Sequence, residues 1–591
     1  MLNIQNKYKI IKLFYRLTFL LSLFGLFILI FDFGFNQPEQ VQNKLNGFYI
    51  VVLCVGIITT ILRYITQRKN LEAKVILFDS LSIIITLLVI YFHFFSEEAH
   101  QHITILYSDN WMKITILLTF IREFSEQNIN YKRTLLNPAQ LFIISFLGII
   151  FLGTLLLLLP NATYNGISFL DALFTSTSAV CVTGLIVVDT GSYFTQFGQT
   201  IILVLIQAGG IGILTFASYF SYFFKGVSSY ENQLVLSDMT NSKKIGEVFS
   251  ILKKILIITF SIEILGAFFI YFSLNNSLLP TVFERSFFAV FHSISAFCNA
   301  GFSTLTAGLR ETGFKHNYGL QSIIILLLTL GGLGFPIIAN LIKYSKYHIK
   351  NSLLGLKKGK IEYKHKPWVL NINSRITLIT TFSLLIIGTI FFYLSEYNNT
   401  LSDHQGIGKF VTALFGAATP RTAGFNTIDM NGLNISTIIM TFLLMWIGAS
   451  PASTGGGIKT STFAIAVLNF ISLAKGKSRI EIFRREISDI SVRRASATIM
   501  LSLIVIGFGI MAILIFDPDK ELLGVAFECF SAYSTVGLSL GITASLSAPS
   551  KLIIITIMFI GRVSMLSILI AIFKKVKYKN YRYPTEEITI N

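Results

Sequence analysis

Long apolar stretches separated by short polar ones are the dominant pattern of this sequence. Many of these stretches run for 18 residues or more, the length at which an apolar helix crosses the hydrocarbon core of a bilayer. The pattern therefore predicts an all-α, multi-pass membrane protein, and chain length alone does not set a domain count. The stretches include Phe142–Leu159, Gln199–Phe216, Ile255–Phe272, Gln321–Ile342, Ile376–Leu394, Ile499–Phe516 and Leu552–Phe573.

The N-terminal part, residues 1–134, is expected to form a transmembrane extension of about four helices. Three apolar spans cover about 15–31, 47–65 and 75–95, and a weaker one covers about 110–123. With the N-terminus in the cytoplasm, four crossings return the chain to the cytoplasm, whereas three would leave it outside. The parity therefore favours the weak fourth span.

The remaining residues, 135–591, are expected to hold four copies of one unit: a spanning helix, a short helix, a loop and a second spanning helix. The units are predicted at about 135–225, 245–345, 370–475 and 495–580. Because each unit begins on the same side, they are expected to pack with pseudo-fourfold symmetry about the membrane normal. The second spanning helices are predicted to start near Gln199 and to cover about 319–343, 435–473 and 551–573.

The short helices are the feature that predicts a pore. They are too short to cross a bilayer, and non-helical backbone at membrane depth is tolerated only where it is buried in protein or faces water. Four such units therefore predict a central water-filled cavity. The short helices are expected at about Ser168–Ala179, Val282–Phe297, Gly406–Thr419 and Glu521–Ala532.

Each short helix leads into a loop in which a glycine precedes a large apolar residue. The loops are Cys181–Leu185, Cys298–Phe302, Arg421–Phe425 and Ser534–Leu538, and their glycines lie 117, 123 and 113 residues apart. A helix C-terminus carries partial negative charge, so four of them aimed at one point favour a cation. Glycine permits the backbone conformations that turn carbonyl oxygens inward, as in a selectivity filter. The alternative is four unrelated glycines in ordinary helix-to-loop turns. Their equivalent positions after four short helices disfavour this alternative.

The candidate ion-binding residues are three consecutive positions in each loop, ending at the glycine. Thr183 and Thr535 are expected to add hydroxyl groups, and Asn299 is expected to brace the second loop. The full set is Val182, Thr183, Gly184, Asn299, Ala300, Gly301, Thr422, Ala423, Gly424, Thr535, Val536 and Gly537.

A second candidate site is Met445–Thr460, which interrupts the third inner helix. Proline removes a backbone donor, and each of three successive glycines costs a helix about 1 kcal/mol relative to alanine. The break lies 24 to 33 residues after Gly424, below the filter, where a flexible loop can close the cavity; a tolerated kink needs fewer helix-breaking residues. The candidate gate residues are Ser450, Pro451, Ser453, Thr454, Gly455, Gly456, Gly457, Lys459 and Arg562.

Arg562 joins this set because it stands alone inside an apolar span, 25 residues after Gly537. Such an arginine is costly in a membrane and usually faces a cavity. Lys574 comes 12 residues later, roughly 18 Å along a helix, so the arginine is too deep to reach the interface. We expect it to line the pore near the broken helix.

Two further features have local explanations. The runs Gln207–Gly212 and Gly331–Pro336 do not complete a dinucleotide-binding motif, and close helix packing is the better interpretation. The acidic residues Asp171, Glu284 and Glu528 lie on or beside the short helices. They can satisfy helix N-termini or attract cations at the mouth of the pore, and a local structural role is expected for each of the three rather than ion coordination.

Composition and charge placement orient the protein. Hydrophobic residues make up 53% and charged residues 13%, and the net charge is +18. Nine Lys and Arg residues fall in Leu341–Arg375 and seven in Lys475–Arg494, which places these segments in the cytoplasm and the glycine loops outside. Because the charge follows membrane topology rather than forming one basic domain, no nucleic-acid partner is expected.

The loop sequences resemble the filter patterns of the Trk/Ktr/HKT superfamily of potassium transporters, especially its bacterial membrane subunits. The matching segments are Val182–Leu185, His292–Phe302 and Arg421–Thr427, and the resemblance runs from about Asn137 to Lys575. In that family a glycine in every filter accompanies potassium selectivity, and a serine in the first filter accompanies sodium. The filters lack the Tyr-Gly of channel-type TVGYG sequences, which implies weaker ion binding or selectivity.

The same resemblance extends to the gate. The family has an intramembrane gating loop in the third inner helix, which Met445–Thr460 resembles, and a pore-lining arginine, which Arg562 resembles. The family's Gly-Pro after this arginine is replaced here by Val563-Ser564-Met565, so the shape of the helix at this point stays open. Residues 1–134 lie outside the family core and receive no role from the resemblance.

The expected function is potassium uptake across a bacterial inner membrane, with K⁺ as the transported ion and no covalent cofactor. Sodium uptake or sodium-coupled potassium transport is the alternative, and a non-conducting membrane sensor is a more distant one. An enzyme is not expected, because no nucleophile–base pair or metal-type cluster stands out. By resemblance, the partners are a second copy in a homodimer, membrane lipid and a cytosolic nucleotide-binding subunit of the RCK type that docks on the basic segments.

Overall fold

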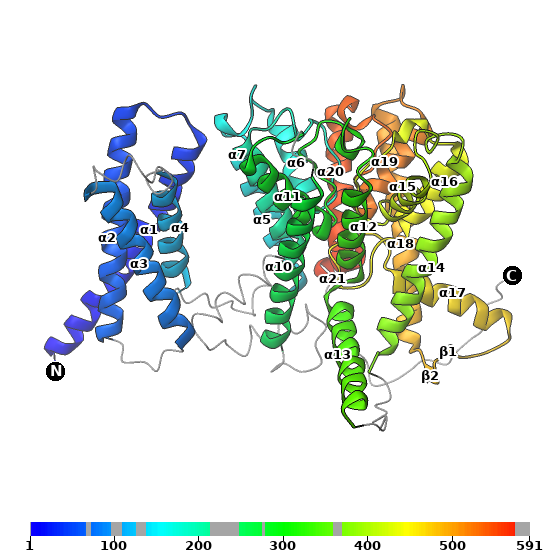
Figure 1. Ribbon diagram of the computed structural model, residues 1–591, viewed down its shortest axis with the longest axis horizontal. Helices are drawn as coiled ribbons and strands as arrows, with labels where there is room; N and C mark the ends of the chain where they lie inside the picture. The colour runs from blue at the N-terminus through cyan, green and yellow to red at the C-terminus, as the bar shows by residue number, and fades with distance from the viewer. Residues whose placement is uncertain are drawn as a thin grey trace.

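The computed structural model describes residues 2–66, 73–95, 109–125, 138–212, 248–274, 278–358 and 369–573. Within these residues the protein is built from helices, and its only sheet is the two-stranded hairpin of β1 (Glu481–Ile482) and β2 (Arg485–Glu486). Figure 1 shows two bodies side by side: an N-terminal bundle and a larger helical array. The all-α membrane fold predicted from the sequence is confirmed.

The N-terminal bundle consists of α1 (Leu2–Gly34), α2 (Glu39–Thr66), α3 (Ala73–Phe95) and α4 (Asp109–Ser125). Helix α4 packs against the other three. All four predicted helices are present, including the weak fourth one.

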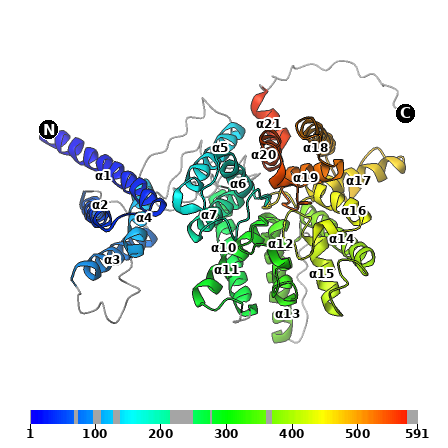
Figure 2. The ribbon, with the colours of Figure 1, turned by 90° about the horizontal axis from the view of Figure 1, so that it is seen from above.

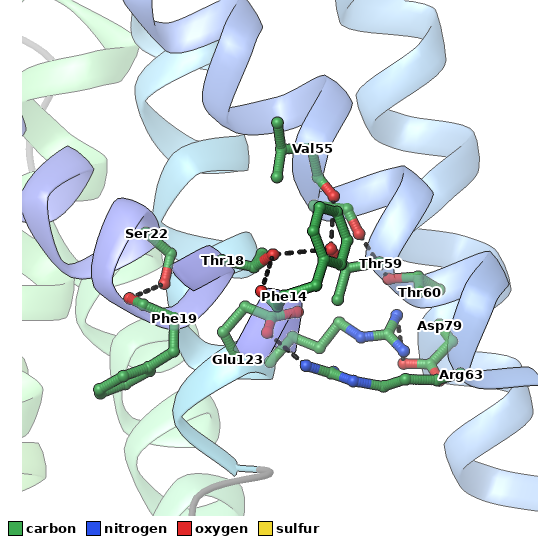
Figure 3. A network of polar contacts seen from close by, with 12 residues as sticks. Phe14, Thr18, Phe19, Ser22, Val55, Thr59, Thr60, Arg63, Asp79 and Glu123 are labelled. Carbon is green, nitrogen blue, oxygen red and sulfur yellow. Dashed lines mark hydrogen bonds and ion pairs between the residues drawn. The ribbon is translucent and has the colours of Figure 1, made fainter. Parts of the chain in front are cut away.

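Buried ion pairs hold the bundle together at one end (Figure 3). Arg63 pairs with Glu123, and Arg122 pairs with Asp79 at 3.0 Å, so α2, α3 and α4 are joined. All four side chains are at least nine-tenths buried. Charged groups inside a bilayer must find partners within the protein. Charges that look isolated in the sequence are therefore paired by the fold.

The bundle touches the larger array at the C-terminal end of α1. The Phe33 ring stacks on Phe197 of the first repeat, with centroids 5.7 Å apart, and the Asn161 side-chain amide donates to the Phe33 carbonyl at 3.1 Å. A further ion pair, Asp32 with Lys113 at 3.1 Å, lies next to this contact. The contact fixes one face of the first repeat against the bundle.

The larger array repeats one arrangement, in which a short helix (the pore helix of each repeat) packs against the outer helix before it. In three repeats the pore helix also packs against its own inner helix, and in the third repeat it packs against the inner helix of the second. Viewed from above, the repeats follow one another around a common centre (Figure 2). The first two repeats comprise α5 (Pro138–Leu157), α6 (Phe169–Val180) and α7 (Gln196–Ile211), then α10 (Val248–Ser273), α11 (Val282–Cys298), α12 (Tyr318–Leu333) and α13 (Phe335–Lys358). The last two comprise α14 (Ile372–Glu396), α15 (Ile407–Ala418), α16 (Ile435–Trp446) and α17 (Thr460–Ala474), then α18 (Asp489–Phe516), α19 (Leu522–Ser534), α20 (Ala548–Val563) and α21 (Met565–Ile572).

Apolar cores between neighbouring repeats close the array. One core joins Phe174 of the first repeat to Ile554 of the fourth, so the ends of the array meet. Another joins Phe288 of the second repeat to Phe415 of the third. Short 3-10 helices occupy the loops around the pore helices: η2 (Pro160–Ala162), η4 (Gly308–Arg310), η5 (Met430–Gly432) and η6 (Thr543–Ser545).

All four pore helices begin within one residue of the predicted position, and side chains cap the first turns of α6 and α11. The Ser168 hydroxyl accepts the backbone N–H of Asp171 at the start of α6. Thr281 and Glu284 form a reciprocal capping box at the start of α11. These side chains satisfy backbone donors that a helix start leaves free.

The inner helices are less regular than predicted. Continuous helices over 319–343 and 551–573 are wrong, because the first breaks at Gly334 (φ +82°) and the second at Ser564 (φ +73°). The helix axis bends by 104° between α12 and α13. A left-handed backbone conformation ends an α-helix, and Pro336 sits in the first turn of α13, where proline is tolerated. The predicted break in the third inner helix is confirmed, between Trp446 and Thr460.

Among the described residues, five single helices are long and apolar enough to cross a membrane, and the bent α12–α13 pair adds one more candidate. Other apolar helices are shorter, among them α16 and α17 on either side of the break in the third inner helix. Much of the basic segment expected as a loop over 341–375 is helical, since α13 continues to Lys358 and projects from the array (Figure 1).

Candidate ion pathway

The four glycine loops share one backbone geometry. In each loop the glycine and the residue two positions before it have positive φ, a conformation that is uncommon for residues other than glycine. The φ angles are +58° and +85° at Val182 and Gly184, +61° and +71° at Asn299 and Gly301, +76° and +77° at Thr422 and Gly424, and +50° and +90° at Thr535 and Gly537. The loops are therefore structural copies, despite their different sequences.

The four glycines form a closed ring. A Cβ atom added to any one of them would collide with the carbonyl oxygen of the residue before the next glycine, so the loops lie in close contact around one centre. The distances from this Cβ would be 2.3 Å for Gly184 to Ala300, 2.8 Å for Gly301 to Ala423, 2.2 Å for Gly424 to Val536 and 2.3 Å for Gly537 to Thr183. Only glycine fits this approach.

Hydroxyl groups on the pore helices hold the loops in place. The Gly184 and Gly537 N–H groups donate to the hydroxyl oxygens of Ser178 and Ser531, each at 3.0 Å. In the other two repeats the hydroxyl donates to a loop carbonyl: Ser295 to Phe302 at 2.8 Å and Thr419 to Phe425 at 2.6 Å. Our sequence reasoning missed these residues. A Ser or Thr five or six residues before each glycine was the available signal.

The predicted supporting side chains have different surroundings. The Asn299 amide lies 3.1 Å from the Thr422 hydroxyl, so it links the second loop to the third. The Thr535 hydroxyl accepts the N–H of Gly456 at 2.8 Å. The Thr183 hydroxyl is buried and has no hydrogen-bond partner among the described residues.

A cavity lies directly outside the ring. It has a volume of about 170 Å³, and Gly184, Gly301, Gly424 and Gly537 all line it. A second cavity of about 300 Å³ shares several of its lining residues, including Asp189. Together they form a vestibule (the two cavities above the ring) that leads from the outer loops to the glycines.

The broken third inner helix lies against the other side of the loops. Within the gate loop (residues 447–459), the Gly456 N–H bonds to Thr535 of the fourth filter, and a Cβ on Gly455 would lie 2.1 Å from the Thr422 hydroxyl of the third. The Thr454 hydroxyl donates to the Phe297 carbonyl at the end of the second pore helix, at 3.3 Å. The gate loop therefore contacts three repeats directly beneath the ring.

The gate loop is an ordered segment. The Ser450 N–H donates to Gly332 at 2.9 Å, and the Ser453 hydroxyl bonds back to the Ser450 carbonyl at 2.6 Å. The Pro451 carbonyl lies against Gly334, where α12 breaks. Lys459 folds back, and its ammonium group donates to the Gly455 carbonyl at 2.6 Å. The predicted gate residues are thus brought together.

Arg562 connects the gate loop to the first repeat. One guanidinium nitrogen donates to the Thr454 carbonyl, and another donates to the Gly209 carbonyl on α7. With this bridge, the gate loop is linked to all four repeats. The sequence prediction that Arg562 contacts the broken helix is confirmed.

Glycines in the inner helices let these helices approach the ends of the pore helices. A Cβ on Gly209, Gly331 or Gly561 would lie 2.0, 1.9 or 1.9 Å from a pore-helix carbonyl oxygen, in Val180, Phe297 and Tyr533 respectively. This confirms close helix packing as the reason for the glycine runs at 209 and 331.

The three acidic residues singled out in the sequence separate into two groups. Asp171 accepts from Ser168 at 2.8 Å and pairs with Lys551 at 2.7 Å, and Glu284 completes a capping box. Both have the local structural roles that were predicted. Glu528 lies in the middle of α19, is fully buried, and bonds to side chains of the vestibule wall. No group of three or more His, Cys, Asp or Glu side chains within the described ranges is arranged to hold a metal ion.

A helical membrane protein with four filter-like loops around one centre and an intramembrane loop beneath them has the architecture of a cation transporter. Residues 109–582 match the family model of TrkH, a cation transport protein. The chain belongs to this family.

Its curated relatives are named as transporters. The chain is 36% identical to Ktr system potassium uptake protein B of Bacillus subtilis, over 76% of this chain and 96% of the relative. It is 33% identical to potassium/sodium uptake protein NtpJ of Enterococcus hirae, over 78% and 98%. The crystal structure of the potassium transporter TrkH from Vibrio parahaemolyticus has the same fold, with a TM-score of 0.57 at 17% identity, covering 84% of this chain and 97% of that one.

The inner-helix contact gives a stability prediction. Gly331→Ala places a methyl group 1.9 Å from the Phe297 carbonyl, so the helices must separate, at a cost of about 1–3 kcal/mol or more. We expect a lower melting temperature in detergent, measured by loss of the monodisperse chromatographic peak.

Gly507→Ala is the matched control, since nothing lies within 4 Å of its new methyl group. It should leave the melting temperature unchanged or slightly raise it, because alanine favours a helix. Equal melting curves for the two variants would contradict the close packing at Gly331.

Proposed function

We propose that this protein takes up potassium ions through the ring of Gly184, Gly301, Gly424 and Gly537, and that residues 447–459 gate the pathway from below. The observation that supports this most directly is the closure of the ring, in which each loop meets the next at its glycine. The named activities of the potassium-transporting relatives add support. The proposed division is an extension over residues 1–134 and a pore over residues 135–591.

The proposed filter uses backbone oxygens in place of water. Four pore helices end at the ring, and their C-terminal partial charges favour a cation there. Carbonyl oxygens of the candidate residues replace the hydration shell, as in other potassium filters. The hydroxyl bonds from Ser178 and Ser531 fix the loops, so the ring resists collapse around a smaller ion.

The proposed gate acts by steric and electrostatic closure. Residues 447–459 lie under the ring, and Arg562 ties them to α7 while adding a positive charge to the cation path. Opening requires the loop to give up its contacts with Thr422, Thr535 and Phe297. A loop held by a small number of hydrogen bonds and close contacts can be released by a modest force that another protein subunit applies.

A cytosolic nucleotide-binding subunit is the proposed source of this force. It would dock on α13 and on the basic segment around the β1–β2 hairpin, which face the side away from the filter (Figure 1). We also propose that the protein works as a homodimer in a bacterial inner membrane. Regulated opening should then depend on the partner subunit, and flux unchanged by its deletion would count against it.

Sodium uptake, or sodium-coupled potassium uptake, is the second candidate. It is supported by the relative from Enterococcus hirae, whose name includes both ions. A non-conducting sensor is a weaker candidate, because all four glycines, the gate loop and Arg562 are retained.

Growth rescue tests the proposed function. The full chain is expressed in a bacterial strain lacking its own potassium uptake systems, with and without a regulatory subunit, and Rb⁺ uptake is measured with and without Na⁺. Rescue at low external K⁺ is expected. Uptake of Na⁺ alone would favour the second candidate, and no cation flux in any combination would contradict both.

Gly184→Ser tests the filter. The added side chain would push against the Ala300 carbonyl, widen or distort the ring and weaken discrimination against the smaller ion. We expect the ratio of K⁺ to Na⁺ uptake to fall by about tenfold, equivalent to 1.4 kcal/mol. Gly166→Ser is the control on an outer loop, because Gly166 has a similar positive φ (+76°, against +85° at Gly184) but nothing near its Cβ, so it carries the backbone strain without the clash. An unaltered ratio in Gly184→Ser would contradict the filter assignment.

Arg562→Gln tests the gate. Glutamine cannot bridge Thr454 and Gly209 as the guanidinium does, and it removes the charge from the path. We expect severalfold higher K⁺ flux without the regulatory subunit. Arg562→Lys keeps the charge with a single ammonium group, so an intermediate flux would separate tethering from charge. A flux equal to wild type in Arg562→Gln would contradict this role.

A further inference from the structure

Glu528 differs from Asp171 and Glu284, the other two acidic residues singled out in the sequence, because it does not lie at the start of a pore helix. It is the seventh residue of α19, far from the capped first turn, and its side chain is 0% exposed. Its carboxylate makes no ion pair within the described part of the chain. A buried carboxylate is costly, so its position calls for an explanation other than capping.

The hydrogen bonds of Glu528 lead to the vestibule. Both of its oxygens accept from hydroxyl groups of the loop that follows the fourth filter, one from Ser539 and one from Thr543 at 3.0 Å. Ser539 comes two residues after Gly537 and lines the same cavity as the four ring glycines. Thr543 lines the adjoining cavity. The carboxylate therefore stands directly behind the vestibule wall.

The direction of these bonds matters for a cation. A hydroxyl group has one proton and two lone pairs. Because Ser539 and Thr543 give their protons to the carboxylate, their oxygens can present only lone pairs towards the cavity. The Gly541 N–H uses one lone pair of Ser539, at 2.8 Å. The Ser539 and Thr543 oxygens lie 3.0 Å apart, and when both hydroxyl protons go to Glu528 this contact uses neither oxygen as an acceptor, so the second lone pair of Ser539 stays available. With this arrangement of protons, the Ser539 and Thr543 hydroxyl groups accept towards the cavity and do not donate.

Two other carboxylates line the vestibule, those of Asp189 and Asp429. Asp429 is paired with Arg310 at 3.1 Å, and both line the outer cavity. Asp189 is held by the N–H and hydroxyl of Ser192, each at 2.8 Å. Glu528 differs from both in being buried behind the wall, nine residues before Gly537, where it acts through the Ser539 and Thr543 hydroxyl groups.

We propose that Glu528 is a positioning residue for cation entry: it concentrates cations in the vestibule and orients the Ser539 and Thr543 hydroxyl oxygens towards an ion approaching the ring. The inference rests on the proposed transport function and deepens it. A field of one sign in a low-dielectric cleft raises the local concentration of the opposite ion. Loss of Glu528 should therefore weaken apparent affinity more than maximal rate.

A purely structural brace is the competing explanation, since the same bonds tie the loop to α19. A brace would lower the amount of folded protein or the maximal rate, and its loss would not depend on ionic strength. An electrostatic role changes the half-saturating cation concentration, and salt screens it within about 10 Å at 0.1 M. These two readouts distinguish the explanations.

The experiment measures Rb⁺ uptake by the full chain in cells lacking other potassium uptake systems, at matched membrane expression, as a function of external Rb⁺. For Glu528→Gln we expect KM to rise roughly tenfold, with Vmax within about twofold of wild type. Adding about 0.5 M choline chloride should raise the wild-type KM towards the variant value and leave the variant value unchanged.

Two matched variants complete the test. Glu284→Gln removes an acid from the first turn of α11, where glutamine also serves in a capping box, and should leave KM unchanged. Ser539→Ala removes one oriented hydroxyl and keeps the carboxylate, and should raise KM by about two- to threefold. This variant decides the matter if Glu528→Gln does not reach the membrane.

An unchanged KM in Glu528→Gln overturns the inference, as does an unchanged KM in Ser539→Ala if only that variant folds. Saturable uptake by the wild type leaves the proposed function standing in either case. A fall in Vmax with unaltered KM and salt dependence overturns it in favour of a brace. Absence of saturable wild-type cation uptake contradicts the proposed function and the inference together.

Discussion

Backbone carbonyl oxygens at membrane depth must bond within the protein or face water and ions, and the rest of this structure follows from that constraint. Each of the four loops leaves its pore helix in an unusual backbone conformation, and none could hold it alone. Contact between neighbouring loops, at Gly184, Gly301, Gly424 and Gly537, supplies the missing support. The ring is therefore a product of all four repeats together.

The surrounding parts serve this ring. Hydroxyl groups such as those of Ser178 and Ser531 fix its backbone from the pore helices, and inner-helix glycines allow close approach from the outside. The vestibule opens above it and residues 447–459 close against it from below. Arg562 links this loop to the first repeat, so a displacement of either inner segment reaches the filter. Under the proposed function, selectivity and gating share one set of contacts.

The parts that depend on local sequence were predictable, and those that depend on assembly were not. Apolar length predicted the spanning helices, the run of proline and glycines predicted the broken third inner helix, and capping residues such as Ser168 fixed the pore-helix starts. The break at Ser564 was not predicted, because serine rarely takes a positive φ without tertiary support. The hydrogen bonds of Glu528 were also not predictable, since only the fold brings Ser539 and Thr543 to it.

The central claim is that the four glycine loops bind the permeating ion, and anomalous X-ray diffraction from Rb⁺-soaked crystals tests it most directly. Rubidium substitutes for potassium and is located by its absorption edge. The account predicts anomalous density on the axis of the ring, within coordination distance of the carbonyl oxygens before Gly184, Gly301, Gly424 and Gly537. Density confined to other sites, with an ordered but empty ring, would contradict it.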